Sequence, residues 1–230
     1  MTLRAWVHGL ASMVAALVGL PGLGCSSTPS LLYRAEAIDG RVVDDDTKKP
    51  IEGVIVVAEW ELVDGLMDPV PVGDLEILET VTNAEGSYHF DGWGPKEVKS
   101  ARFHGNDPRL IFFKGGYEFK SLRNSLHPPG AGSPMYDESG QPRSVWSGRT
   151  IDLRPEPPSY AVSDQAFETL YSPFKGCMWK KMPRLLAMLV TTTGIAHDGG
   201  PKARSLLLQI MNGRSQAQCG QVEEQIRNYL

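Results

Sequence analysis

The middle of the chain carries short stretches in which apolar and polar side chains alternate with the two-residue period of a β-strand. Residues 54–57 are a β-branched run, and in residues 87–90 Tyr88 and Phe90 alternate with polar neighbours. Residues 109–114 and 117–122 flank a Gly-Gly pair, which predicts a hairpin. Residues 150–153 form the last expected strand before Pro155. These patterns predict a mainly β domain over residues 36–154.

After a proline-rich stretch at residues 154–158, the apolar period changes from two to about 3.6 residues. Apolar stripes then occur in residues 185–190, 206–211 and 219–229, and a shorter helix is expected at residues 163–171. We therefore expect a small helical domain over residues 159–230. A unit of three or four short helices is marginally stable unless it packs on another domain or is cross-linked.

The first 24 residues are typical of an export signal. Arg4 precedes an apolar run at residues 10–20, and residues 21–24 end that run with small and helix-breaking residues. The run is shorter than the ~20 residues that a helix needs to cross a bilayer. Cys25 follows directly and resembles the lipid acceptor of a bacterial lipoprotein, with residues 25–35 as a tether. Gly22 and Leu23 depart from the usual lipobox, so cleavage by an ordinary signal peptidase remains open.

Three segments together resemble a known family. They are Gly-Arg-Val-Val-Asp at residues 40–44, Pro-Ile-Glu-Gly-Val-Ile-Val at 50–56, and Thr-Asn-Ala-Glu-Gly-Ser-Tyr-His-Phe at 82–90. In order and spacing they resemble the carboxypeptidase regulatory-like family of transthyretin-like β-sandwiches. The resemblance implies a transthyretin-like sandwich and an accessory role, because such modules usually stand beside a catalytic or transport domain and carry no zinc ligands. Within it, Gly86 is expected to take a positive φ in a turn.

Two stretches between the expected strands, residues 63–73 and 123–148, look irregular. The second is long for a loop in a compact domain, and such loops are often functional. It contains Met135, Tyr136 and Trp146, which we expect to contact a partner. The equally weighted alternative is a loop folded back over the sandwich edge.

The sequence offers weak candidates for chemistry. Asp44, Asp45 and Asp46 with Glu85 lack the spacing of a calcium loop, and a charged turn is their expected role. Neither His89 nor His104 stands in a zinc-binding spacing. No serine lies in a Gly-x-Ser-x-Gly context, and the tryptophans Trp60 and Trp93 are expected to pack. We therefore expect no catalytic, metal or cofactor-binding residue.

Two enzyme families share the expected sandwich. Intradiol ring-cleaving dioxygenases need two Tyr and two His around ferric iron, but the paired His-x-His is missing here. Hydroxyisourate hydrolases end in Tyr-Arg-Gly-Ser, whereas this chain ends in Arg-Asn-Tyr-Leu at residues 227–230. A metal-dependent enzyme of the intradiol type remains the alternative to a non-catalytic protein.

The chain has three cysteines, and an exported chain meets an oxidising compartment where thiols tend to pair. A Cys177–Cys219 bridge would cross-link the helical domain and leave Cys25 for a lipid. A bridge from Cys25 to either partner is the competing arrangement.

A net charge of −4 without a polybasic segment argues against nucleic-acid binding. The sequence thus predicts a cell-envelope lipoprotein of a Gram-negative bacterium, on the outer membrane and facing the periplasm. We expect it to be a non-catalytic binding or accessory module for an envelope protein or glycan, anchored by its N-terminal lipid. The oligomeric state is left open.

Overall fold

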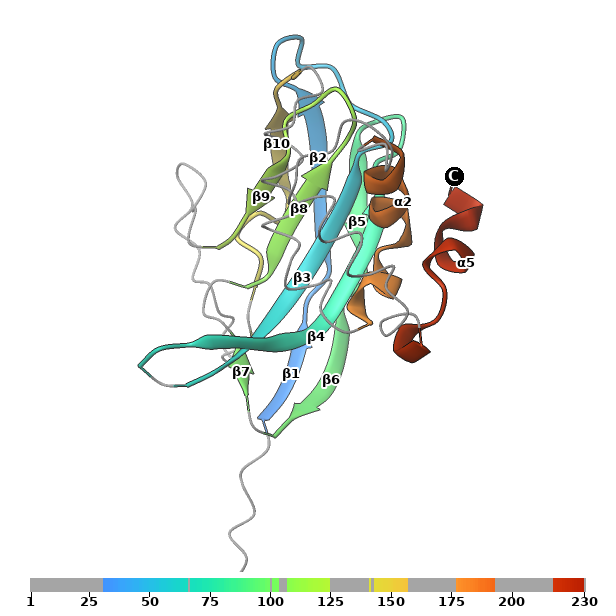
Figure 1. Cartoon of the computed structure of the whole chain (residues 1–230). Coiled ribbons are helices and arrows are strands. Elements are labelled where there is room, and N and C mark those ends of the chain that lie inside the picture. Colours follow the sequence, from blue (N-terminus) through green and yellow to red (C-terminus); the bar gives the residue numbers. More distant parts are fainter. Residues whose placement is uncertain are drawn as a thin grey trace, which may run out of the picture.

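A computed structural model of the chain describes residues 31–65, 67–99, 101–103, 107–124, 141, 143–156, 177–192 and 217–229. The described part is mainly β, as the alternating patterns predict (Figure 1). Its strands are β1 (Leu31–Ala35), β2 (Ile38–Asp44), β3 (Ile55–Asp64), β4 (Val70–Val81), β5 (Ser87–Phe90), β6 (Trp93–Val98), β7 (Arg102–Phe103), β8 (Arg109–Phe113), β9 (Lys120–Leu122) and β10 (Arg149–Leu153). Its helices are η1 (Met178–Lys181), α2 (Pro183–Thr192), α5 (Val222–Ile226) and η3 (Arg227–Tyr229).

The strands form three sheets. The largest has the order β4-β3-β8-β9, all antiparallel, and β7 pairs with the end of β3. A second sheet has the order β10-β2-β5, in which β10 runs parallel to β2. The strands β1 and β6 make a separate antiparallel pair.

One hydrophobic core joins the two larger sheets. Val42, Phe90 and Ile151 of the smaller sheet share a buried cluster with Val56 and Phe112 of the large one. The sheets therefore pack face to face. Close approach inside this core explains one glycine: a Cβ on Gly40 would lie 2.3 Å from the hydroxyl of Tyr88, which covers β2 from the neighbouring strand.

A second core lies on the opposite face of the large sheet, where the helices pack. Val57 and Ile111 of the sheet share it with Leu185 of α2 and with Val222 and Ile226 of α5. Strand residues alternate faces, so Val56 and Val57 point into different cores. In the described part, the helical residues share their core with the sheet and form a layer on it. Packing on the large sheet thus supplies the burial that short helices lack on their own.

Two specific links hold this helical layer. The predicted Cys177–Cys219 disulfide is confirmed, with an S–S distance of 1.99 Å and a Cα–Cα distance of 5.2 Å. The carboxylate of Glu79 on β4 accepts the backbone N–H groups of Arg184 (3.0 Å) and Leu185 (2.8 Å) in the first turn of α2. Since first-turn N–H groups have no partner within a helix, Glu79 acts as a cap supplied by the sheet.

Two expectations about boundaries are wrong. Residues 63–73 are not irregular throughout: β3 and β4 stay paired out to Asp64 and Val70, so Val63, Asp64 and residues 70–73 are the end of a long hairpin. Its glycines and prolines are typical of a loop, which is why the sequence pattern was misleading. In the structure, Gly65 and Gly73 take positive φ values of 86° and 145° within or beside the hairpin. The predicted tether is also too long, because Leu31–Ala35 are strand β1.

Other local predictions are confirmed. Gly86 has a φ of 72° in the turn after β4, and its N–H donates to the carbonyl of Asn83. The Gly-Gly turn joins β8 to β9, with Gly116 at a φ of 86°. None of the helices among the described residues is long and apolar enough to cross a membrane.

Candidate functional site

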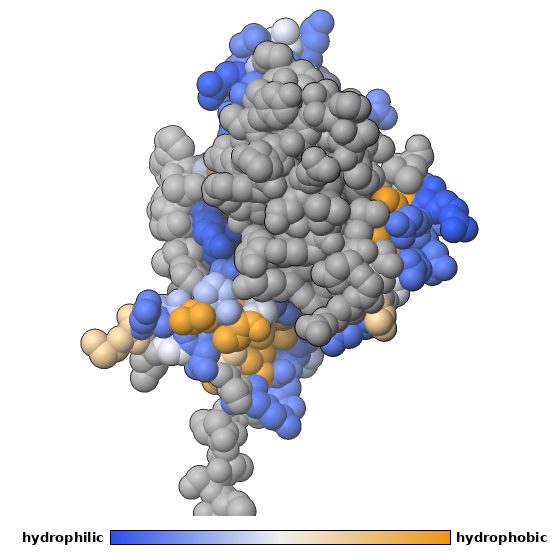
Figure 2. Space-filling view, viewed as in Figure 1, coloured by the Kyte–Doolittle hydropathy of each residue, from blue (hydrophilic) through white to orange (hydrophobic). Residues whose placement is uncertain are grey.

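Exposed apolar side chains gather at the end of the molecule formed by the β3–β4 hairpin tip and the start of β1. Figure 2 shows apolar side chains over this lower end of the visible face. Met67 is 100% exposed, and the others are about half exposed or more. We call this set the apolar end; it consists of Leu31, Leu32, Met67, Val70 and Val72.

The hairpin tip protrudes because β3 and β4 are longer than their neighbours. Beyond Trp60 the pairing shifts register twice, and only the two-residue strand β7 accompanies β3 there. Val70, Pro71 and Val72 are all exposed, so both faces of β4 are open at the tip. The turn itself is held by polar contacts: Arg102 Nη2 donates to the carbonyl of Gly65 (2.8 Å).

The start of β1 completes the apolar end. Leu31 pairs with Val98 and Leu32 with Glu97 in the two-stranded β1–β6 sheet. Neighbouring residues of a strand point to opposite faces, yet both leucines are exposed. This end of the β1–β6 pair is therefore open on both sides, as the hairpin tip is.

Behind the apolar end, the large sheet carries buried charges. Four carboxyl groups and two guanidinium groups belong to this cluster: Glu59, Glu61, Asp74, Asp107, Arg109 and Arg123. Arg109 pairs with Glu59, and Arg123 pairs with Glu61 (3.2 Å) and, at 3.6 Å, with Asp107. Because carboxyls outnumber guanidiniums, the cluster is neutral only if carboxyls take up protons.

Burial raises the pKa of three of these carboxyl groups. It raises the pKa of Asp107 to about 8, against the opposing attraction of Arg123. Burial, together with the nearby charge of Glu59, also raises the pKa of Asp74 to about 8. Burial raises the pKa of Glu59 as well, although Arg109 opposes it. Asp74 and Asp107 are thus largely protonated at neutral pH. Such groups can move protons, but perturbed carboxyls also occur in structural networks.

No ligand set accompanies these carboxyls. Among the residues that the structure describes, no three His, Cys, Asp or Glu side chains are arranged to hold a metal ion. A small cavity of about 60 Å³ lies at the β1–β2 junction, lined by Trp60, Arg143, Ser144 and Ser147 among others. Ligand pockets usually enclose ~300 Å³ or more, so this cavity is small for an organic substrate.

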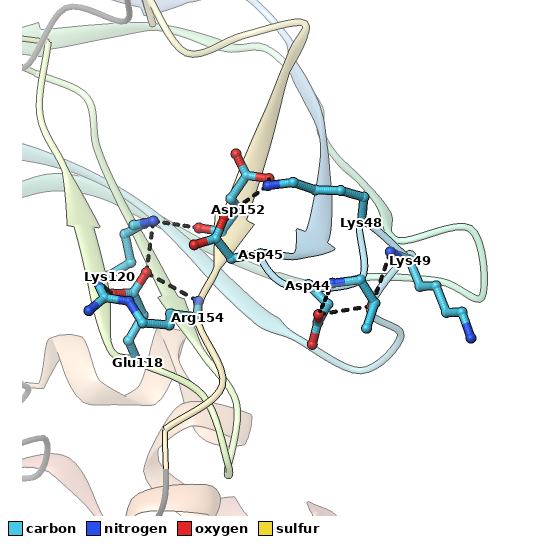
Figure 3. Close-up of polar contacts among 9 residues, drawn as sticks. Asp44, Asp45, Lys48, Lys49, Glu118, Lys120, Asp152 and Arg154 are labelled. Atoms are coloured by element: carbon cyan, nitrogen blue, oxygen red, sulfur yellow. Dashed lines mark hydrogen bonds and ion pairs between the residues drawn. The ribbon is translucent and has the colours of Figure 1, made fainter.

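The aspartates of residues 44–46 belong to a charged turn. Asp44 accepts the backbone N–H of Thr47 (2.7 Å), which lowers its pKa first of all, and also the hydroxyl of Tyr117 (3.1 Å). Lys48 pairs with Asp45 (2.8 Å) and with Asp152 of β10 (3.0 Å). Figure 3 shows Lys48 of the turn reaching Asp152 of β10, whose backbone carbonyl accepts from Lys120 at the start of β9. Ion pairs this exposed contribute little stability each, so the turn is a solvated connection.

Of the other residues singled out in the sequence, Trp146 and His89 are among those that the structure describes. The Trp146 indole N–H donates to the carbonyl of Arg123 (3.0 Å), and its ring packs against the core between the sheets, so at Trp146 the loop folds back over the sandwich. Met135, Tyr136, Cys25 and His104 lie outside the described residues. His89 is exposed and bonded to Asp39 (2.6 Å) and Asp91 (3.1 Å), which raise its pKa.

Trp60 and Trp93 pack against each other, as expected. Their ring centroids are 5.2 Å apart in an edge-on arrangement between the sheets. The apolar end was missed in the sequence, because its two parts, residues 31–32 and residues 67–72, are about 35 positions apart and the second sits among loop-like prolines and glycines. The alternation of Val70 and Val72 with prolines was the available signal.

Comparisons with known proteins add little to this geometry. No family model matches the chain, and no curated protein matches it. Among solved structures, a 9R-lipoxygenase from Cyanothece PCC8801 is similar at 16% identity and a TM-score of 0.25, over 79% of this chain. The chain spans 25% of the length of that lipoxygenase chain. A likeness at this level carries no inference about fold or function.

Proposed function

We propose that the protein is an exported, lipid-anchored binding module of the cell envelope, without catalytic activity, built on a transthyretin-like sandwich of the carboxypeptidase regulatory-like type. The face-to-face sheets support the fold. So do two glycines of the family-like segments: Gly40 lies beneath Tyr88, and Gly86 takes a positive φ in its turn. Gly86 takes the positive φ that its family-like segment predicts.

The apolar end is the observation that carries the binding role. A soluble protein rarely leaves a fully exposed methionine beside exposed valines and leucines unless that surface meets something apolar. An enzyme instead needs a concave site with convergent polar groups, and the cavity described above is small. Such a surface suits an apolar partner in the envelope better than a glycan.

Anchoring is the second half of the proposal. The Cys177–Cys219 disulfide fits an oxidising compartment and accounts for two of the three cysteines. Cys25 is then the one left for acylation. A lipid there would keep the module at the membrane surface, since β1 begins only six residues later.

The test has two readouts on the full chain expressed in a Gram-negative host. Mass spectrometry of the purified protein should find an N-terminal peptide that begins at an acylated Cys25. A photo-crosslinking residue in place of Met67 should trap an apolar partner in envelope fractions, whereas the same residue in place of Tyr229 should trap much less. Tyr229 is a matched control because it is exposed but lies on the helical layer. An unprocessed N-terminus, or equal trapping at both positions, would overturn the proposal.

A further inference from the structure

We infer that the apolar end rests on a phospholipid bilayer, with the hairpin tip and the start of β1 dipping into the boundary between headgroups and acyl chains. This inference deepens the proposed function and rests on it: the bilayer is the one that holds the lipid on Cys25. Three observations favour a lipid surface over a protein as the occupant.

The first observation is the distance to the anchor. Only five residues, 26–30, separate Cys25 from Leu31. Even fully extended, they let Leu31 move about 20 Å from the anchored cysteine. The end of the domain that carries Leu31 must therefore face the membrane, and the exposed apolar side chains lie on that end.

The second observation is the shape of the apolar end. Both strands that build it expose consecutive residues: Leu31 and Leu32 in β1, and Val70, Pro71 and Val72 in β4, where the two valines share one face and Pro71 lies on the other. Consecutive residues point to opposite faces of a strand. A rigid protein partner covers one face, but a fluid bilayer surrounds a protruding tip and covers both. Met67, fully exposed between the strands, is then the deepest side chain.

The third observation is the charge beside the tip. Lys99, just after β6, is 73% exposed, and its ammonium lies 3.9 Å from the carboxylate of Glu97. Arg102 lies in β7 beside the hairpin and holds its turn through the carbonyl of Gly65. Cations at this level can meet lipid phosphates, each contributing favourably near an anionic surface. Asp68 directly follows Met67 and keeps the insertion shallow.

The experiment uses the mature full chain with Cys25→Ser, so that no acyl chain contributes to binding. Met67→Cys then supplies the free thiol for an environment-sensitive fluorophore, because Cys177 and Cys219 are bonded to each other. Vesicles of phosphatidylethanolamine and phosphatidylglycerol (about 3:1) are added. The label at position 67 should shift to the blue, and the same label at Tyr229→Cys should not. In co-flotation, Val70→Asp with Val72→Asp should lower the bound fraction about tenfold or more, while Tyr229→Asp leaves it unchanged.

No blue shift at position 67, or flotation that the two aspartates leave unchanged, would overturn the inference. A protein trapped at position 67 in envelope fractions, without a shift on vesicles, would assign the apolar end to a protein instead and leave the proposed function standing. An unmodified Cys25 with a clear shift on vesicles would count against the proposed anchoring and not against the lipid contact. The failures of the two proposals are therefore distinguishable.

Discussion

Removing the Cys177–Cys219 disulfide should cost more stability than any single substitution on the surface. The bridge closes a loop with a sequence separation of 42 residues. The loss of loop-closure entropy in the unfolded chain predicts a stabilisation of ~4 kcal/mol for such a loop, and measured values tend to be smaller. We therefore expect the double substitution Cys177→Ala and Cys219→Ala to lower the free energy of unfolding by about 2–4 kcal/mol.

Loss of the bridge should also destabilise the C-terminal residues 217–229 more than the rest of the protein. Cys219 lies in the same buried cluster as Trp179 of η1 and as Val222 and Ile226 of α5. Without the bridge, this apolar packing and the cation–π contact of Arg184 with the Tyr229 ring are the described contacts that hold residues 217–229 on the helical layer. These residues should then open before the sheets do, because α5 is too short to be stable alone. Limited proteolysis should cut there first in the variant, and buried Trp179 should shift its fluorescence to the red on opening.

Urea titration followed by tryptophan fluorescence measures the global effect. With a typical slope of ~2 kcal/mol per molar urea, the midpoint should fall by about 1–2 M. The Cys25→Ala variant is the control, since it removes a cysteine without touching the bridge. Wild-type protein under reducing conditions should behave like the double variant. An unchanged midpoint and unchanged protease resistance in both would refute the loop-entropy reasoning and the dependence of α5 on the bridge.

Three further predictions concern the sheet and its charges. Glu79→Ala should lower the free energy of unfolding by ~1 kcal/mol in urea titration, because it uncaps α2. Gly86→Ala should cost clearly more than Gly116→Ala in the same assay: both have positive φ, but only a Cβ at Gly86 meets a backbone oxygen, at 2.4 Å. Stability should fall as pH rises from 6 to 9, since Asp74 and Asp107 have pKa values of about 8 when folded and ordinary values near 3.8.

The sign of the pH effect follows from proton binding. A carboxyl with a raised pKa holds a proton in the folded protein that the unfolded chain has already lost, so its contribution is full below about pH 4 and is lost as pH rises through 8. The slope is at most ~1.4 kcal/mol per pH unit for each group. Asp107→Asn should flatten the urea midpoint between pH 6 and 9. A midpoint that rises with pH would contradict the placement of these carboxyls. The control for Glu79→Ala is Glu85→Ala, which lies in an exposed turn and should leave the stability unchanged. If Gly86→Ala and Gly116→Ala cost the same stability, the steric explanation for Gly86 is wrong.

Much of the β architecture could be predicted from local patterns. The β-branched run at residues 54–57, the alternation around Tyr88 and the Gly-Gly turn each fall on the strand or turn that the structure shows. These signals are local because strand period and glycine φ depend on adjacent residues. The Cys177–Cys219 disulfide was the favoured pairing of three cysteines in a chain that the sequence predicts to be exported, with a bridge from Cys25 as the alternative.

The apolar end and the charged cluster could not be predicted in this way. Met67 and Leu31 lie at the ends of separate strand pairs, β3–β4 and β1–β6, and their exposure depends on which neighbouring strands stop short. Glu59 and Asp107 look like ordinary surface carboxyls in the sequence, yet the fold buries both. Their raised pKa values arise from that burial.

The sequence by itself determined where the chain is extended, where it turns and which cysteines can pair, since these depend on neighbouring residues and on residue counts. The tertiary structure alone decided that the helices form a layer on the large sheet, that Glu79 caps α2, and that residues 63–73 continue a hairpin. Burial, capping and protrusion depend on which distant segments lie side by side, and a one-dimensional pattern does not contain that information.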